Sequence, residues 1–161
     1  MHELQQKFVA LPAAMTTLEN VSGTAVVPAA LETFADSEFI SELVRLINEE
    51  RAKAGVKPLV LDEKLTEIAG LKAKEMYDLS YFSHVSPNYG NPRQFAQRCG
   101  YANYSGVGEN IYRAFNAKPC DIIAWWMQSP SHRKNLLNPM YTKAGFGGYG
   151  NLFYALELAR N

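Results

Sequence analysis

The sequence predicts an α+β fold in one domain, and two observations support that class. Segments with helical periodicity come first along the chain, and segments with the alternation of β-strands come last, an order typical of α+β proteins. The chain has 161 residues, of which 47% are apolar. That size and composition suffice for one core without a metal or a disulfide to hold it together.

The first 36 residues are predicted to be a tail or linker, because Pro12 and Pro28 interrupt any helical period. We therefore place the domain at residues 37–161 and expect the tail to be peripheral to it. The domain opens with a long amphipathic helix that has Asp36 or Ser37 as its N-cap. Its apolar stripe recurs at the spacing of a helix face and comprises Phe39, Ile40, Leu43, Val44 and Ile47.

Three further helices are predicted at residues 62–79, 91–100 and 119–129. Asp62 and an Asn-Pro pair at 91–92 suit the first positions of the first two, and Gly100 suits the end of the second. The third helix must end before Pro130, because the residue that precedes a proline is disfavoured in helical dihedrals. The Trp-Trp pair in it is more typical of a core than of a ligand platform.

The C-terminal segment predicts a β-hairpin. A glycine-rich strand at residues 145–149 is followed by Gly150-Asn151, a suitable hairpin turn. Apolar residues then alternate along the last strand, so that one face carries Leu152, Tyr154, Leu156 and Leu158. The sequence therefore predicts an antiparallel sheet after the helices.

Charge and hydropathy exclude several classes of protein. The 16 basic and 16 acidic residues balance, and no cluster of Lys and Arg occurs, which argues against a nucleic-acid partner. No run approaches the roughly 18 apolar residues of a membrane-spanning helix, and the N-terminal segment lacks the features of a signal peptide. Export would therefore need a signal that this sequence does not contain.

Three residues are candidates for a site. His84 and His132 each lie in a segment rich in Ser and Pro that we expect to be a loop, and Glu109 follows two glycines in Gly106-Val107-Gly108. Two imidazoles and a carboxylate can bind a divalent metal if the fold brings them together. Their spacing matches no short zinc motif, so a second interpretation stays open: the histidines cap backbone groups and the glutamate forms an ion pair.

Three motifs, in order, resemble one known family. They are Phe-Ser-His-Val-Ser-Pro around His84, Gly-Glu-Asn-Ile around Glu109 and Trp-Met-Gln-Ser-Pro-Ser-His-Arg-Lys-Asn-Leu-Leu around His132, and they follow an Asn-Glu-Glu-Arg helix segment at 48–51. On these motifs the chain resembles the bacterial SCP-like branch of the CAP superfamily. That superfamily joins cysteine-rich secretory proteins, antigen 5 and pathogenesis-related 1 proteins. The resemblance covers roughly residues 38–158.

The resemblance implies a three-layer α-β-α sandwich with a central antiparallel sheet, usually exported, and an open cleft that binds zinc in some members. In this chain His84, Glu109 and His132 match the cleft residues, with the two histidines as the metal ligands. Gln128 stands where many eukaryotic members have a second glutamate, which weakens any mechanism that needs two acids. The last strand also departs, because Phe-Tyr-Ala-Leu-Glu replaces the usual segment that contains Thr-Gln.

The two cysteines leave an alternative open. Cys99 and Cys120 would sit at the end of one helix and the start of the next, so they could pair if the protein is exported. Neither cysteine lies in a recognisable catalytic context.

Two function classes remain. In the first, the chain is an extracellular or cell-surface binding module for a small lipid, glycan or peptide, with no obligatory cofactor and with zinc or another divalent cation as an optional one. In the second, it is a zinc-dependent peptidase or esterase with Glu109 as the candidate catalytic base. We favour binding, because members of this fold differ in function and Glu109 is the one base in the matched set. A scaffold domain with an idle cleft is a third interpretation.

Overall fold

The computed structural model describes residues 36–101 and 106–160. Within them the chain forms five helices and a four-stranded sheet, which confirms the α+β class. The predicted tail lies outside these residues apart from Asp36, so the domain boundary stays a prediction.

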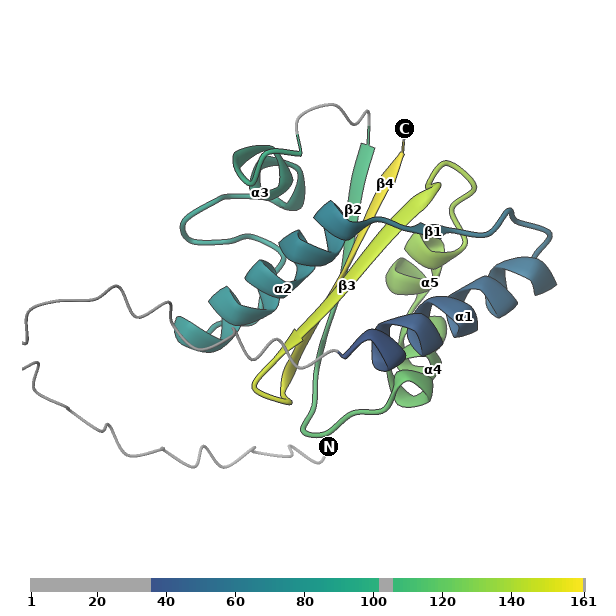
Figure 1. The fold of residues 1–161 in the computed structure, drawn as a ribbon, viewed down its shortest axis with the longest axis horizontal. Helices are drawn as coiled ribbons and strands as arrows, with labels where there is room; N and C mark the ends of the chain where they lie inside the picture. The colour runs from purple at the N-terminus through teal and green to yellow at the C-terminus, as the bar shows by residue number, and fades with distance from the viewer. Residues whose placement is uncertain (1–35, 102–105, 161) are drawn as a thin grey trace, which may run out of the picture. The chain divides into compact units, whose positions relative to one another are not determined.

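The sheet has the strand order β1-β3-β4-β2 (Figure 1). Strands β3 (Lys143–Tyr149) and β4 (Phe153–Arg160) form the predicted hairpin, and β2 (Gly106–Arg113) pairs antiparallel with the other side of β4. Strand β1 (Val60–Leu61) instead runs parallel to β3, so the sheet is mixed and the prediction of a purely antiparallel sheet is corrected. This short strand links two helices on opposite faces of the sheet, and its direction is set by that crossover rather than by a hairpin.

Helices cover both faces of the sheet (Figure 1). Helices α1 (Ser37–Lys53), α4 (Pro119–Gln128) and α5 (Pro130–Leu136) pack on one face, and α2 (Glu63–Asp78) and α3 (Pro92–Arg98) pack on the other. The three-layer sandwich is therefore confirmed, including the predicted cover of the sheet by the helices that start at Ser37 and Pro119.

The helix starts follow the capping chemistry that the sequence predicts. Asp36 and Asp62 accept hydrogen bonds from the backbone three residues on, at 2.7 and 3.0 Å. Asn91 forms a reciprocal capping box at the start of α3. Gly55 and Gly100 lie just past the ends of α1 and α3 with φ of 69° and 88°, a region that glycine adopts without strain.

Helix α2 lies directly on the backbone of β3. A Cβ at Gly145 would lie 2.1 Å from the carbonyl carbon of Leu65 and from the amide nitrogen of Thr66, and a Cβ at Gly147 would lie 2.3 Å from the amide nitrogen of Gly70. Any side chain at these positions would force the helix away. The two glycines therefore allow α2 to seal this face of the sheet.

The guanidinium of Arg51 joins α1 to the segment that follows α5. Arg51 has no exposed surface, and it donates hydrogen bonds to the carbonyl oxygens of Lys57, Leu136, Asn138 and Tyr141 at 2.7 to 3.1 Å. A buried charge is tolerable when it is fully hydrogen-bonded. Arg51 belongs to the Asn-Glu-Glu-Arg segment, and its role there is structural.

Candidate functional site

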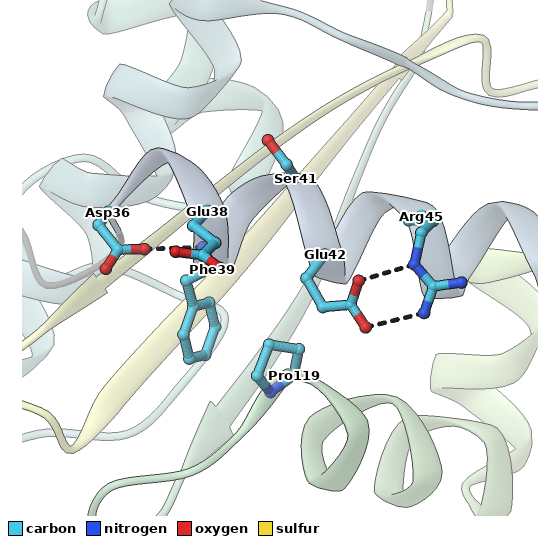
Figure 2. Close-up of a pocket in the computed structure, with 7 residues that line it drawn as sticks. All are labelled: Asp36, Glu38, Phe39, Ser41, Glu42, Arg45 and Pro119. Carbon is cyan, nitrogen blue, oxygen red and sulfur yellow. Dashed lines mark hydrogen bonds and ion pairs between the residues drawn. The ribbon is translucent and has the colours of Figure 1, made fainter.

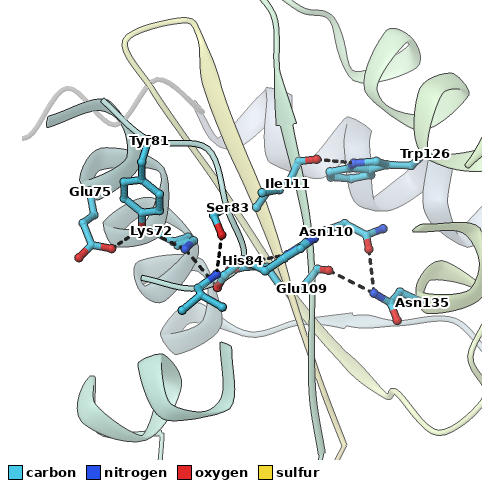
Figure 3. Close-up of polar contacts among 11 residues, drawn as sticks. Lys72, Glu75, Tyr81, Ser83, His84, Glu109, Asn110, Ile111, Trp126 and Asn135 are labelled. Atoms are coloured by element: carbon cyan, nitrogen blue, oxygen red, sulfur yellow. Dashed lines mark hydrogen bonds and ion pairs between the residues drawn. The ribbon is translucent and has the colours of Figure 1, made fainter. Parts of the chain in front are cut away.

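The loop that carries His84 connects α2 to α3 and is anchored on Glu75 of α2 (Figure 3). The hydroxyl of Tyr81 donates to Glu75 Oε2 at 2.5 Å. The hydroxyl of Ser86 and the amide of Asn88 donate to Glu75 Oε1 at 2.8 and 2.9 Å. Three hydrogen bonds to one carboxylate thus hold the loop on both sides of His84.

Lys72 supports the same loop from beneath. Its Nζ donates to the Tyr81 hydroxyl at 3.0 Å and to the carbonyl oxygen of His84 at 3.4 Å. Lys72 has no exposed surface, and its burial lowers the pKa of the ammonium group. The carboxylates of Glu109, Glu75 and Glu157 act in the opposite direction. The backbone of His84 is therefore fixed by a buried cation with acidic neighbours.

Glu109 holds the imidazole of His84. Its Oε1 lies 2.7 Å from His84 Nδ1, and the exposed fraction is 1% for the Glu109 side chain against 48% for that of His84. The resemblance places Glu109 in an open cleft together with the histidines. The structure corrects this, because Glu109 points to the α2 side of the sheet and orients His84 from within (Figure 3).

His132 lies in helix α5 and not in the loop that its Ser and Pro neighbours predict. Pro130 forces Ser129 into an extended conformation, which ends α4, and then occupies the first position of α5. The hydroxyl of Ser129 lies 2.8 Å from His132 Nδ1. Burial, and to a lesser degree the charge of His84, lowers the pKa of His132, so its ring is neutral at neutral pH.

The two imidazoles meet beside β2. Their ring centroids are 6.3 Å apart, and the planes cross at 44°. Each Nδ1 is engaged within the protein, by Glu109 and by Ser129. Among the residues that the structure describes, neither Nε2 has a hydrogen-bond partner, so these nitrogens are the ones open to a ligand.

An indole extends this surface. Trp125 keeps 46% of its surface exposed, and its ring lies 5.0 Å from that of His132. Its neighbour Trp126 is buried and donates from Nε1 to the carbonyl oxygen of Ile111 at 3.2 Å. The expectation that both tryptophans belong to the core is therefore confirmed for Trp126 and wrong for Trp125.

The geometry limits how a metal could be shared. Zinc–nitrogen bonds of about 2.0 to 2.1 Å, with ~1.1 Å from nitrogen to ring centre, put two centroids about 6.4 Å apart on a line and about 5.2 Å apart at a tetrahedral angle. The observed 6.3 Å therefore requires an approach of about 1 Å for tetrahedral binding. In residues 36–101 and 106–160, no three His, Cys, Asp or Glu side chains are grouped to hold a metal.

Gln128, the remaining predicted cleft residue, lies outside this pair of histidines. Gln128 is exposed in the last turn of α4, and its side chain makes no hydrogen bond to His84, Glu109 or His132.

Two hollows described in the structure are also separate from the histidines. One, of about 500 Å³, lies between the start of α1 and Pro119 (Figure 2), and the other lies between α2 and α3.

The two thiols are free in the structure. Cys99 packs in the cluster between α2, α3 and the sheet, whereas Cys120 is exposed at the start of α4 on the other face. The sheet therefore separates them, and the pairing considered from the sequence does not form in this structure.

Glu157 is the site residue that our sequence analysis missed. It lies on β4 directly opposite Glu109, with 1% of its surface exposed. Burial and the neighbouring Glu109 raise the pKa of Glu157 well above its ordinary value. The signal in the sequence was an acid within an otherwise apolar strand, Phe153–Ala159.

The comparisons now identify the family. Residues 44–151 match the model of the CAP family, described as the cysteine-rich secretory protein family. The chain belongs to the CAP family. The match includes His84, Glu109 and His132 and so contains the whole pair of imidazoles with its supporting acid.

Bacterial relatives of this CAP domain agree with that assignment. The uncharacterized protein YkwD of Bacillus subtilis is 38% identical over 134 residues, which are 83% of this chain and 49% of that protein. A solved extracellular protein of Bacillus anthracis with an SCP domain is 31% identical with a TM-score of 0.72, over 77% of this chain and 41% of its own. The chain thus spans about half the length of these relatives or less.

A third solved structure shares the fold. An outer surface protein of Borrelia burgdorferi has a TM-score of 0.72 at 19% identity, over 81% of this chain and 98% of its own. Within the described part of this CAP domain, no helix has both the length and the apolar character that a membrane crossing needs.

Proposed function

We propose that this CAP domain is a binding module that acts outside the cell or at its surface and holds a small ligand at His84 and His132. Two relatives support the location, since one is described as extracellular and another as an outer surface protein. The observation that carries the proposal is the anchoring of both Nδ1 atoms. It leaves the two Nε2 atoms for a ligand, beside the exposed indole of Trp125.

This surface suits a glycan or a peptide better than a lipid. Neutral imidazole nitrogens accept hydrogen bonds from hydroxyl or amide groups, and an exposed indole packs on the apolar face of a sugar or a side chain. The hollows described near α1 and between α2 and α3 are not lined by the histidines. A lipid that occupied either of them would bypass the pair.

A divalent cation is an optional part of the proposal. His84 and His132 would hold it through Nε2, while Glu109 and Ser129 orient the two rings, an arrangement common for histidine ligands. When bound, zinc would supply a positive charge that polarises a ligand oxygen. The lowered pKa of His132 keeps that ring in the neutral form that binds metal.

One observation favours catalysis as the second candidate. A histidine held by a buried carboxylate at 2.7 Å is the arrangement of a general base. When no cation occupies Nε2, His84 would accept a proton through that atom as the base of a peptidase or esterase, while Glu109 would stabilise the charged ring. Glu109 itself would not contact the substrate, which differs from the role of base that the sequence suggested.

Calorimetric titration with zinc alone tests the cation. We expect binding in the wild type, none in the double variant His84→Ala/His132→Ala, and wild-type behaviour in His2→Ala, which removes a histidine outside the pair. Equal heats in the wild type and the double variant would remove the metal from the proposal.

Tryptophan fluorescence tests the ligand. A chitooligosaccharide, a short peptide and a fatty acid are titrated in turn, and we expect the glycan or the peptide to change the emission of the wild type but not of Trp125→Phe, in which buried Trp126 remains. No response to any of the three would contradict the binding function. Hydrolysis of a peptide or ester panel by the wild type, measured with and without zinc and absent from the double histidine variant, would replace it with the hydrolase.

A further inference from the structure

Glu109 and Glu157 form a pair of facing carboxyl groups. They are direct partners in the antiparallel register of β2 and β4, so both side chains leave the sheet on the same face. Side chains in such positions have Cβ atoms about 4.5 to 5.5 Å apart. The exposed fractions of the two residues are 5% and 1%, so both carboxyl groups are shielded from bulk solvent.

Each carboxyl group has one buried oxygen without a hydrogen-bond donor among the described residues. Glu109 Oε1 is engaged by His84, while the Oε2 atoms of Glu109 and Glu157 are both buried, and neither has a hydrogen-bond donor among the described residues. An unpartnered buried polar oxygen is costly. A proton between the two Oε2 atoms gives both of them a partner.

The charges that face Glu157 favour a proton on it. Lys72 comes from α2, Cys99 from the C-cap of α3 and Glu109 from β2, while its neighbour on β3 is Gly145, which has no side chain. The one ammonium group there, that of Lys72, lies among three carboxyl groups, since Glu75 also acts on it. Two buried carboxylates side by side do not both ionise. Glu109 Oε1 already lies 2.7 Å from His84 Nδ1, so the geometry places the shared proton on Glu157.

We propose that Glu157 is a positioning residue, which as a neutral acid donates a hydrogen bond to Glu109 Oε2 and so keeps Glu109 turned toward His84. Glu109, as a carboxylate, then accepts the Nδ1 proton of His84, and His84 Nε2 carries the free lone pair. The order of contacts is Glu157, Glu109, His84. This inference deepens the proposed function, since it names the atom that meets the ligand, and it rests on that function only for the identity of the site.

The nitrogen NMR spectrum of histidine-labelled full-length protein, without metal, tests the inference. At neutral pH we expect the proton of His84 on Nδ1 in the wild type and in Glu157→Gln, because the amide also donates to Glu109. In Glu157→Leu, Glu109 loses its donor, and we expect a mixture that includes the Nε2–H form. Glu67→Gln makes the same chemical change at an exposed glutamate that pairs with Lys64. It serves as the control and should match the wild type.

Two spectra would overturn the proposal. One is a wild type with the His84 proton on Nε2, and the other is a folded Glu157→Leu variant whose His84 proton stays wholly on Nδ1. Neither measurement uses a ligand. The tests are therefore independent. The positioning role of Glu157 can be refuted while zinc or glycan binding is observed, and it can be supported while no binding is observed.

If Glu157→Leu does not fold, Glu157→Gln still decides the question through urea unfolding at several pH values. An acid whose pKa is raised in the folded state stabilises the fold below its unfolded pKa of about 4.3, and this contribution is lost as pH rises toward the folded value. We expect that loss in the wild type and not in Glu157→Gln. Equal pH profiles for the two proteins would show that Glu157 is not the proton carrier and would overturn the inference.

Discussion

Arg51 and Lys72 are both buried cations, and the protein neutralises them in different ways. Arg51 donates to four backbone carbonyl oxygens, none of which titrates. Lys72 contacts a tyrosine hydroxyl and one carbonyl oxygen, and its acidic neighbours are Glu109, Glu75 and Glu157.

The difference separates a structural cation from one that belongs to the site. The partners of Arg51 keep the same charge at every pH at which the protein folds. The acidic neighbours of Lys72 are ionisable, and one of them contacts His84. Lys72 holds the carbonyl oxygen of His84, and Glu109 holds its ring. A buried charge thus indicates a functional region here when its partners are themselves ionisable.

The largest effect is expected when Arg51 is replaced by methionine. Arg51→Met leaves four carbonyl oxygens without their donor, and we expect the free energy of unfolding to fall by about 3 to 5 kcal/mol, equally at pH 5 and pH 8. Urea denaturation measures it. Arg45→Met is the matched control, because Arg45 is exposed and pairs with Glu42 and Glu49. A control as damaging as Arg51→Met would contradict the structural role.

A smaller effect that depends on pH is expected for Lys72→Met. The variant removes the cation from three acidic neighbours, and we expect a loss of about 1 to 3 kcal/mol at neutral pH. The loss should shrink as pH falls toward 4, where protonated carboxyl groups no longer need the charge. The same urea series measures it. A loss independent of pH would place Lys72 in the same class as Arg51 and end the distinction.

The smallest effect concerns His132. Burial lowers the pKa of this ring in the folded state, so the unfolded chain binds the proton first, and stability present above about pH 6.5 is lost as pH falls toward the folded pKa. We expect His132→Asn to lose less stability than the wild type between pH 7 and pH 5. His2→Asn, as control, should follow the wild type, and identical slopes for all three proteins would refute the assignment.

The helices could be predicted from the sequence because their signals are local. Asp36, Asp62 and Asn91 cap the helices that follow them, and glycines with positive φ follow α1 and α3. Helix α5 was not predicted. Pro130 ends the helix before it, but it also occupies the first turn of a new helix. Strand β1 has two residues, too few to show an alternation.

The site could be predicted only in part, because the missing part depends on strand order. The motifs pointed to His84, Glu109 and His132, and the structure brings these three together. Glu109 is buried and faces Glu157 because β4 lies between β3 and β2. A central strand is covered on both faces, so an acid on its second face is buried as well, which the alternation of one strand does not reveal.

Side-chain contacts beside the site also cover the backbone at the edge of strand β2. Among the strands of the described residues, β2 has a partner on one side alone, and its other side would offer backbone groups to a strand of another chain. Asn135 donates to the carbonyl oxygen of Glu109, and Trp126 donates to that of Ile111. A docking strand would first have to displace both side chains, so the edge beside the histidines resists aggregation while their ring nitrogens stay accessible.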